Sequence, residues 1–408
     1  MAVGADMRPE LAPVAGVRLA ATAAGIRAAG RDDLTVLELA PGSRTAAVFT
    51  TNRLRAAPVL VAEEHLAAAA PRLLVINTGS ANAATGAAGM ETARAVCAAA
   101  AEGFGLAPEQ VLPFSTGVIG EPLRLEPFAA GLPRCRDGLA ADAAAWWRAA
   151  DAIRTTDTRP KAASRTVELD GEPVHVTGFA KGSGMIHPNM ATMLAFVATD
   201  AAVADGPLRD LLREAADGSF NRISVDGDTS TNDALTLTAT GAAGAAPLES
   251  AADPRLPALR EAVAAVCRDL ALAIVRDGEG ATRLLTVRVE GAADAAEAAR
   301  VADSVARSPL VKTALFAGDP NWGRILAAAG TALTGEVDWG RVDLHLGATR
   351  VVRGGVVAPD YTEAAGEAAM APEEVTATLS LGRGEAADWM WTCDLTHEYV
   401  TINAEYRS

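Results

Sequence analysis

Aromatic side chains and long apolar runs are scarce in this chain of 408 residues. Phenylalanine, tryptophan and tyrosine make up 4% of the sequence, although hydrophobic residues reach 50%. Much of that content is alanine, which predicts close packing of helices and strands rather than membrane insertion. No uninterrupted apolar stretch reaches the roughly 18 to 20 residues that a membrane helix needs, and residues 1–18 lack the apolar core of a secretory signal. We therefore expect a cytoplasmic protein without a membrane partner.

Runs of basic residues and closely spaced cysteines are absent as well. The net charge is −15, from 36 basic against 51 acidic residues, and no basic run would follow a phosphate backbone. This argues against nucleic acid as a partner. The histidines are scattered and the cysteines form no CxxC pair, so neither a metal site nor a disulfide framework is indicated. We expect four buried thiols: Cys97, Cys135, Cys267 and Cys393.

Short β-rich runs bounded by turn residues are mixed with alanine-rich helical patterns along the whole chain, which predicts an α/β fold. No repeat of about 20 to 50 residues appears, which argues against solenoids and propellers. Strands are expected at 36–40, 45–50, 58–61, 73–77, 193–198, 234–240, 284–289, 342–346 and 398–402. Helices are expected at 83–101, 138–153, 206–217, 254–276, 292–306 and 322–330.

The most informative segment is 181–196, Lys-Gly-Ser-Gly-Met-Ile-His-Pro-Asn-Met-Ala-Thr-Met-Leu-Ala-Phe. It places Thr192 directly after the small residue Ala191, where a glycine-punctuated loop enters an apolar strand. A threonine hydroxyl is a weak nucleophile, and its own α-amino group can serve as base only after the preceding peptide bond is cut. Cleavage between Ala191 and Thr192 would create such a nucleophile. Because short motifs of this kind are common, the spacing alone leaves an ordinary loop as the alternative.

Two further segments carry polar groups that suit acyl transfer. Thr116 and Gly117 follow the apolar run 111–114 and would supply a hydroxyl and an amide at a strand-to-loop turn, although the residues alone favour an ordinary strand end. Lys181 lies on the loop before Thr192, where a lone lysine is usually solvated.

Three more segments are open to both a structural and a functional interpretation. In 154–161, Arg-Thr-Thr-Asp-Thr-Arg-Pro-Lys, Asp157 could bond its own backbone in a turn. Glu279 lies between two glycines after an apolar helix, where a charge usually faces solvent. The C-terminal segment 394–408 alternates like a strand and ends in a polar tail. The polar segments 221–233 and 312–323 show no clear chemical role.

Together these segments closely resemble the ornithine acetyltransferase family, also called the bifunctional glutamate N-acetyltransferase family of arginine biosynthesis. The resemblance runs from Val-Phe-Thr-Thr-Asn at 48–52 to Asn-Ala-Glu-Tyr at 403–406 and so covers nearly the whole chain. It implies a two-lobed αββα sandwich of the aminopeptidase type. It also implies self-cleavage into an α chain, 1–191, and a β chain, 192–408.

The resemblance assigns a role to each candidate residue. Thr192 is the nucleophile and its amine the base, while Thr116 and Gly117 form the oxyanion hole. The implied substrate contacts are Thr155, Lys181, Thr192, Glu279, Asn403 and Ser408. Thr156 is an alternative to Thr155, and Ser408 stands where the family pattern has threonine.

The implied reaction is a ping-pong transfer of acetyl from N2-acetylornithine to glutamate without a metal or organic cofactor, in a heterotetramer of two α and two β chains. Some family members also accept acetyl-CoA, and this sequence leaves that choice open. Three other functions stay open: an N-terminal-nucleophile amidohydrolase or aminopeptidase, a paralogue in secondary metabolism, and an uncleaved binding protein.

Overall fold

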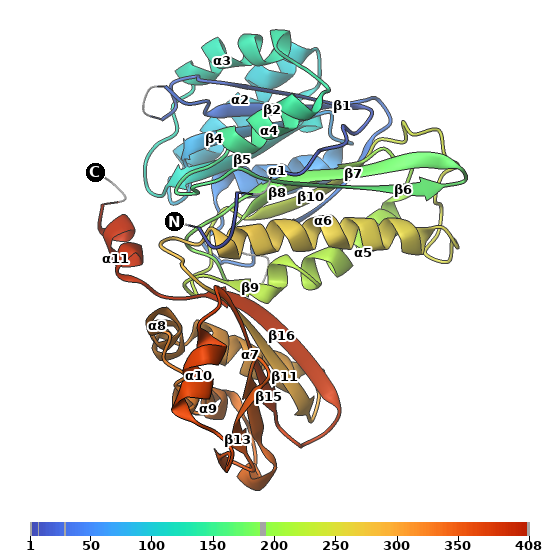
Figure 1. Cartoon of the computed structure of the whole chain (residues 1–408). Coiled ribbons are helices and arrows are strands. Elements are labelled where there is room, and N and C mark those ends of the chain that lie inside the picture. The colour runs from blue at the N-terminus through green and yellow to red at the C-terminus, as the bar shows by residue number, and fades with distance from the viewer. Residues whose placement is uncertain (1, 7, 28–29, 188–192, 406–408) are drawn as a thin grey trace. The chain divides into compact units, whose positions relative to one another are not determined.

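The computed structural model describes residues 2–6, 8–27, 30–187 and 193–405 (Figure 1). The chain divides into two compact units. The large unit comprises Asp6–Asn221 and Asp228–Ile274, and the small unit comprises Met1–Ala5, Arg222–Gly227 and Val275–Ser408. The boundary between residues 191 and 192 therefore falls inside the large unit, not between the units.

Two sheets form the centre of the large unit. The first has the strand order β1-β2-β4-β5, with β4 and β5 parallel and the other pairs antiparallel; its strands are β1 Val17–Thr22, β2 Leu34–Leu39, β4 Leu73–Ser80 and β5 Val111–Val118. The second has the order β3-β10-β8-β7-β6; its strands are β3 Arg44–Phe49, β6 Lys161–Leu169, β7 Glu172–Lys181, β8 Leu194–Thr199 and β10 Ala234–Ala239.

Side chains on β4 alternate between two apolar clusters, as the period of a strand requires. Leu74 and Ile76 join the cluster that also contains Phe179 and Phe196 of the second sheet, so this cluster lies between the sheets. Helix α4, Ala143–Ala152, contributes Trp146 to the same cluster. The neighbouring β4 residues, such as Val75, face the opposite way, into the cluster that α2, Gly86–Phe104, and α3, Glu126–Asp137, cover.

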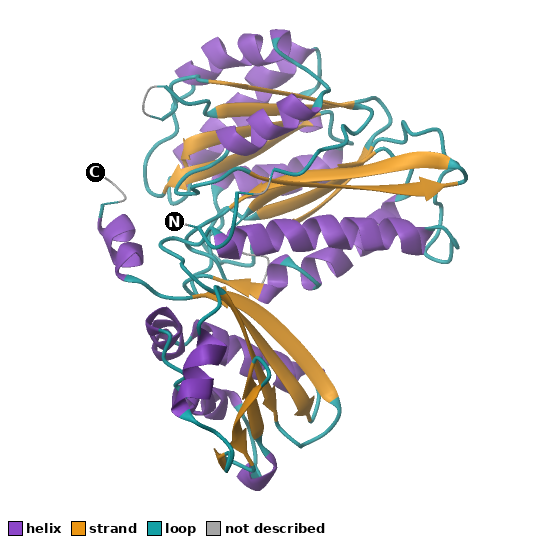
Figure 2. Ribbon diagram, viewed as in Figure 1, coloured by secondary structure: helices purple, strands orange, loops and turns teal. Residues whose placement is uncertain are grey.

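Helices also cover the outer face of the second sheet. Helix α5, Asp205–Asp217, packs against β3 and β10, and α6, Leu256–Arg276, places Leu270 beside Gly178 of β7. The layers are therefore helix, sheet, sheet and helix, as Figure 2 shows in purple and orange. The αββα arrangement expected for the fold is confirmed in the large unit.

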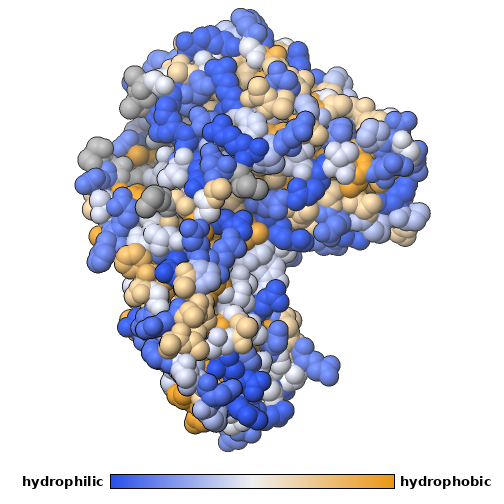
Figure 3. Space-filling model, in the orientation of Figure 1, coloured by the Kyte–Doolittle hydropathy of each residue, from blue (hydrophilic) through white to orange (hydrophobic). Residues whose placement is uncertain are grey.

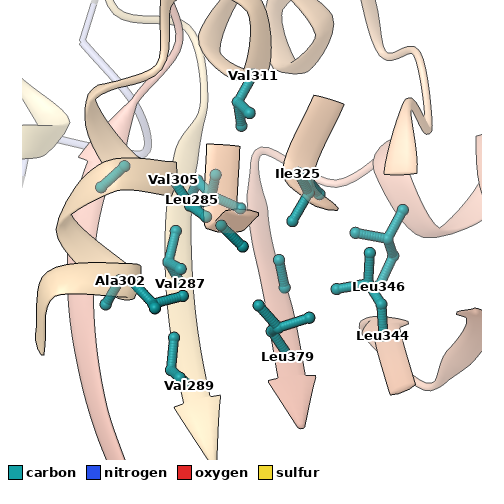
Figure 4. Packing of buried hydrophobic residues seen from close by; sticks show 14 of the residues in the cluster. Leu285, Val287, Val289, Ala302, Val305, Val311, Ile325, Leu344, Leu346 and Leu379 are labelled. Carbon is teal, nitrogen blue, oxygen red and sulfur yellow. The ribbon is translucent and has the colours of Figure 1, made fainter. Parts of the chain in front are cut away.

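The small unit has one mixed sheet with the strand order β14-β13-β12-β15-β11-β16-β9. Its strands are β9 Ile223–Ser224, β11 Leu284–Ala292, β12 Asp343–Leu346, β13 Thr349–Arg353, β14 Val356–Val357, β15 Glu374–Ser380 and β16 Ala386–Cys393. Its helices include α7 Ala295–Arg307, α8 Pro309–Ala317, α9 Trp322–Ala332 and α10 Glu363–Met370. Alternate strand residues such as Leu285, Val287 and Leu379 point at these helices (Figure 4).

Two expected strands are helices in the structure. Residues 58–61 lie in α1, Ala57–Ala68, because Pro58 at the first turn is compatible with helix and the run continues into Glu63, Glu64 and His65. Residues 398–402 lie in α11, His397–Ala404, which begins where the Thr396 hydroxyl accepts the Tyr399 N–H. The other expected elements occur with shifted ends. The helix expected at 292–306, for example, begins at Ala295 because β11 extends to Ala292.

All four cysteines are buried, as expected. Burial raises the pKa of Cys97, Cys135 and Cys267 to about 12, so these thiols stay protonated at neutral pH. Among the described residues, no helix is long and apolar enough to cross a membrane. Hydrophilic side chains cover most of the face drawn in Figure 3, with apolar residues scattered among them.

Candidate functional site

The hydroxyl of Thr116 and the ammonium of Lys181 meet in the large unit. Thr116 follows the core residue Phe114 by two positions on β5, and Lys181 follows Phe179 by two positions on β7. Strand periodicity therefore turns both polar side chains to the inner face, toward the space between the sheets. Lys181 Nζ donates to Thr116 Oγ1 at 3.1 Å, and the two residues are only 9% and 7% exposed. The hydrogen-bonded pair of Lys181 and Thr116 therefore lies at one end of the apolar cluster between the two sheets.

Strand β5 is longer than the sequence predicted, and Thr116 and Gly117 lie near its end, as the strand-end alternative expected. Lys181 is the last residue of β7 rather than a loop residue, and Thr116 and Gly117 lie inside β5, which extends to Val118. The apolar run that predicted an earlier end of β5 stops at Phe114, but backbone pairing with β4 continues through the polar residues. The parallel ladder therefore carries both predicted oxyanion residues.

Asp157 fixes the Thr155 segment beside this pair. Its carboxylate accepts from Lys161 Nζ at 2.6 Å, from the Gly182 N–H at 2.7 Å and from the Thr155 N–H at 3.1 Å. The hydrogen bond from the Thr155 N–H, within the turn, was expected, whereas the bonds from Lys161 and Gly182 were not. The residue thereby joins the start of β6, the residue after β7 and the turn that carries Thr155.

The carboxylate of Asp157 stays ionised despite complete burial of its side chain. Burial alone raises the pKa of this carboxyl. The charges of Lys161 and Lys181, with hydrogen bonds from Lys161 and from the Gly182 N–H, outweigh burial and hold the pKa below its ordinary value.

Gly117 must be glycine because of its neighbour on β4. Its φ is +135°, and a β carbon built on it would lie 2.3 Å from the carbonyl carbon of Gly79, its partner in the ladder. Real side chains do not approach a backbone so closely. The two glycines therefore let β4 and β5 come together at the predicted oxyanion hole.

Asn232 is a positioning residue that the sequence did not reveal. Its buried amide donates from Nδ2 to the Ser115 carbonyl at 3.0 Å and to the Ala81 carbonyl at 2.6 Å. The Thr231 hydroxyl in turn donates to Asn232 Oδ1 at 2.6 Å. Asn232 so ties the ends of β4 and β5 beside Thr116. The polar segment 221–233 was visible in the sequence, but its partners lie more than a hundred positions away.

Glu279 and Asn403 meet in the small unit. Glu279 lies on the expected turn but is 6% exposed rather than solvated, and its Oε2 accepts from Asn403 Nδ2 at 2.7 Å. Gly280 has φ +70°, and a β carbon there would lie 2.6 Å from both Thr396 Oγ1 and the Tyr399 nitrogen. Glycine therefore allows the start of α11 to pack against the turn, which brings Asn403 to Glu279.

Lys312 helps to hold the turn that carries Glu279. This buried lysine donates to the Thr392 hydroxyl at 2.9 Å and to the Cys393 carbonyl. The Cys393 sulfur would lie 3.0 Å from a β carbon on Gly278, so the lysine holds the end of β16 against the Glu279 turn. The sequence had marked 312–323 as polar without giving it a role.

Three predicted residues, Ala191, Thr192 and Ser408, lie outside the described residues. The chain resumes at Met193, and Leu194 at the start of β8 pairs with Lys181. Among the described residues, no group of three or more His, Cys, Asp or Glu side chains could hold a metal ion.

Comparisons with known proteins place this arrangement in a family. The model of the ArgJ family matches residues 18–408. The chain belongs to the ArgJ family. The arginine biosynthesis bifunctional protein ArgJ of Psychrobacter arcticus is 52% identical over 100% of both chains. That of Methylococcus capsulatus is 53% identical over 98% of this chain and 97% of its own length.

Two solved structures are also similar to this family member. The arginine biosynthesis bifunctional protein of Bacillus halodurans is 39% identical, with 52% of this chain and 98% of that chain covered and a TM-score of 0.49. Ornithine acetyltransferase of Mycobacterium tuberculosis in complex with ornithine is 32% identical, with 44% and 93% covered and a TM-score of 0.38.

Replacing Gly117 by alanine tests the close approach of β4 and β5. We expect Gly117→Ala to lower the free energy of unfolding by more than about 3 kcal/mol, since backbone strain and a clash with Gly79 add together. Gly120→Ala is the matched control, because Gly120 also has positive φ but open space around its β carbon; its cost should be about 1 to 2 kcal/mol. Urea unfolding measures both, and equal costs would contradict the close approach.

Proposed function

We propose that this protein is a self-cleaving acyltransferase that moves acetyl from N2-acetylornithine to glutamate through an ester of Thr192. The observation that carries the proposal is the buried hydrogen bond of 3.1 Å from Lys181 Nζ to Thr116 Oγ1. The next residue, Gly117, pairs with Gly79 of the neighbouring strand. Membership of the ArgJ family supports it, as does the name ornithine acetyltransferase carried by a 32% identical relative. The assignment of Thr192 as the nucleophile rests on the sequence, because this residue lies outside the described residues.

The first step is intramolecular. Thr192 Oγ attacks the Ala191 carbonyl, the peptide nitrogen leaves as the new α-amine, and water hydrolyses the resulting ester to free the Ala191 carboxylate. The products are residues 1–191 and 192–408. Strand β8 after the break pairs with β7 before it, and also with β10. The sheet therefore holds the two products together after cleavage.

The transfer uses the freed amine as base. It takes the Thr192 proton as Oγ attacks the acetyl carbonyl, and then gives that proton to the departing ornithine amine. The Thr116 hydroxyl and the Gly117 N–H stabilise the oxyanion. Lys181 donates to Thr116 Oγ1, so the hydroxyl proton is free to point at the oxyanion. The amine of glutamate next attacks the acetyl ester and regenerates Thr192.

The substrate contacts follow from charge. Lys181 suits an α-carboxylate, and Thr155 is held next to it through Asp157. Glu279, joined to Asn403, suits an ammonium group, and Ser408 belongs to the same predicted set. A heterotetramer of two α and two β chains, a cytoplasmic location and independence of cofactors are part of the proposal. Acetyl-CoA as a second donor is a separate question for assay.

Intact mass under denaturing conditions tests self-cleavage. We expect the purified protein to give two fragments with a break between Ala191 and Thr192, because only cleavage frees the amine base. Thr192→Ala should remain a single species of 41.7 kDa. A wild-type protein that stays uncleaved while active would contradict the mechanism.

Acetyl transfer tests the reaction. We expect N-acetylglutamate from N2-acetylornithine plus glutamate, and a loss of at least about a hundredfold in kcat/KM for Lys181→Met, since a buried charged contact is removed. Arg165→Met, which changes an exposed ion pair with Asp269, should keep wild-type activity. Rapid release of acetate without glutamate would indicate an amidohydrolase instead.

A further inference from the structure

Three arginines gather beside the predicted oxyanion strand in the large unit. Arg27 lies directly over Gly79: a β carbon on that glycine would be 2.9 Å from the Arg27 β carbon and 3.2 Å from its α carbon. Gly79 is the ladder partner of Gly117. Arg27 Nη1 also donates to the Arg154 carbonyl at 2.9 Å, next to Thr155. Arg27 thus packs its main chain and β carbon against Gly79 of β4, while its guanidinium contacts the segment that carries Thr155.

The loop that carries Arg27 is built to hold its position. The buried carboxylate of Asp33 accepts four backbone N–H groups, at 2.6 to 3.1 Å, from Ala24, Gly25, Ile26 and Arg27. These backbone amides satisfy the hydrogen-bonding capacity of the Asp33 carboxylate, which therefore does not require a cationic side chain as a partner. The Arg27 side chain is left to point elsewhere.

Positive charge around this loop exceeds the local negative charge. Asp151 is paired with Arg154 at 2.5 Å, and Asp157 is paired with Lys161. In the part of the chain that the structure describes, Arg27 and Arg31 have no carboxylate within ion-pair distance, and the buried Nη2 of Arg31 has no hydrogen-bond acceptor. Burial, Arg154 and Arg27 lower the pKa of Arg31, against the opposite effect of Asp151 and Asp157.

We propose that Arg27 and Arg31, with Arg154 beside them, bind the side-chain carboxylate of the amino acid that accepts the acetyl group. A guanidinium pair matches a carboxylate in charge and geometry. The inference rests on the proposed function and deepens it, because it assigns residues that select glutamate. Ornithine carries an ammonium at the end of its side chain, which this cluster repels.

A carboxylate fits better than the phosphates of acetyl-CoA. Both ligands offer an anion to arginine, but they differ in where that anion lies relative to the acetyl group. The pantetheine arm holds the CoA phosphates far from the thioester, whereas three bonds separate the glutamate α-carbon from its side-chain carboxylate carbon. Arg27 lies on a loop that packs against Gly79, the ladder partner of Gly117, and so it is near the predicted oxyanion hole.

Two acceptor assays on the same acetyl-enzyme test the proposal. Labelled ornithine plus N2-acetylornithine reports transfer to ornithine, and glutamate plus N2-acetylornithine reports transfer to glutamate. For Arg31→Gln and Arg27→Gln we expect kcat/KM for glutamate to fall at least about tenfold through KM, with ornithine exchange within about twofold of wild type. Arg31→Lys should recover part of the loss. Arg165→Gln is the surface control.

Three other results would each contradict a stated part of the proposal. Unchanged glutamate kinetics in both variants, or an equal loss with ornithine and glutamate, would overturn the carboxylate site while leaving the transferase intact. A rise in KM for acetyl-CoA alone would overturn it in favour of phosphate binding. A wild-type protein without ornithine exchange would contradict the proposed function itself, a result that does not depend on either arginine.

Discussion

The buried carboxylate of Asp157 is the interaction on which the candidate site depends. A charge taken out of water is tolerated only when it is paired and fully hydrogen-bonded, and Asp157 meets that condition with Lys161, the Gly182 N–H and the Thr155 N–H. These partners come from β6, from the residue after β7 and from the turn before β6. Moving any one of them would leave a buried charge without its partner, so the three segments are held in one arrangement.

The geometry of the candidate site follows from this constraint together with the core. The end of β7 places Lys181 against Thr116, while the inter-sheet cluster beneath them fixes how far apart β5 and β7 lie. Asn232 then holds the carbonyl of Ser115, the residue before Thr116. The Thr116 hydroxyl is therefore held in place by its surroundings, which is what the proposed oxyanion hole requires.

The sequence predicted the α/β fold and most residues of the candidate site. Where it failed, the cause was a contact between residues far apart in the chain. Pairing of Thr116 with Gly117 and the roles of Lys181 and Glu279 came from motif resemblance, but the contact of Thr116 with Lys181 joins residues 65 positions apart. Burial of Asp157 and Glu279 was missed because charged turn residues are usually exposed. The run 398–402 has β-branched residues in a strand-like alternation, yet the Thr396 cap and the packing of Gly280 select a helix. Tertiary contacts overrode local preference there.

The pH dependence of unfolding tests the role of Asp157 most directly. Because its folded pKa is lowered, the carboxylate contributes stability above its unfolded pKa of about 3.9 and loses it as pH falls through the folded pKa. Urea unfolding should show Asp157→Asn less stable than wild type by about 3 to 5 kcal/mol from pH 5 to 8, with the gap narrowing below about pH 4. Asp151→Asn, in an exposed pair with Arg154, should cost less than about 1 kcal/mol. A gap for Asp157→Asn that is as small as this control, or that widens toward acid, would contradict the account.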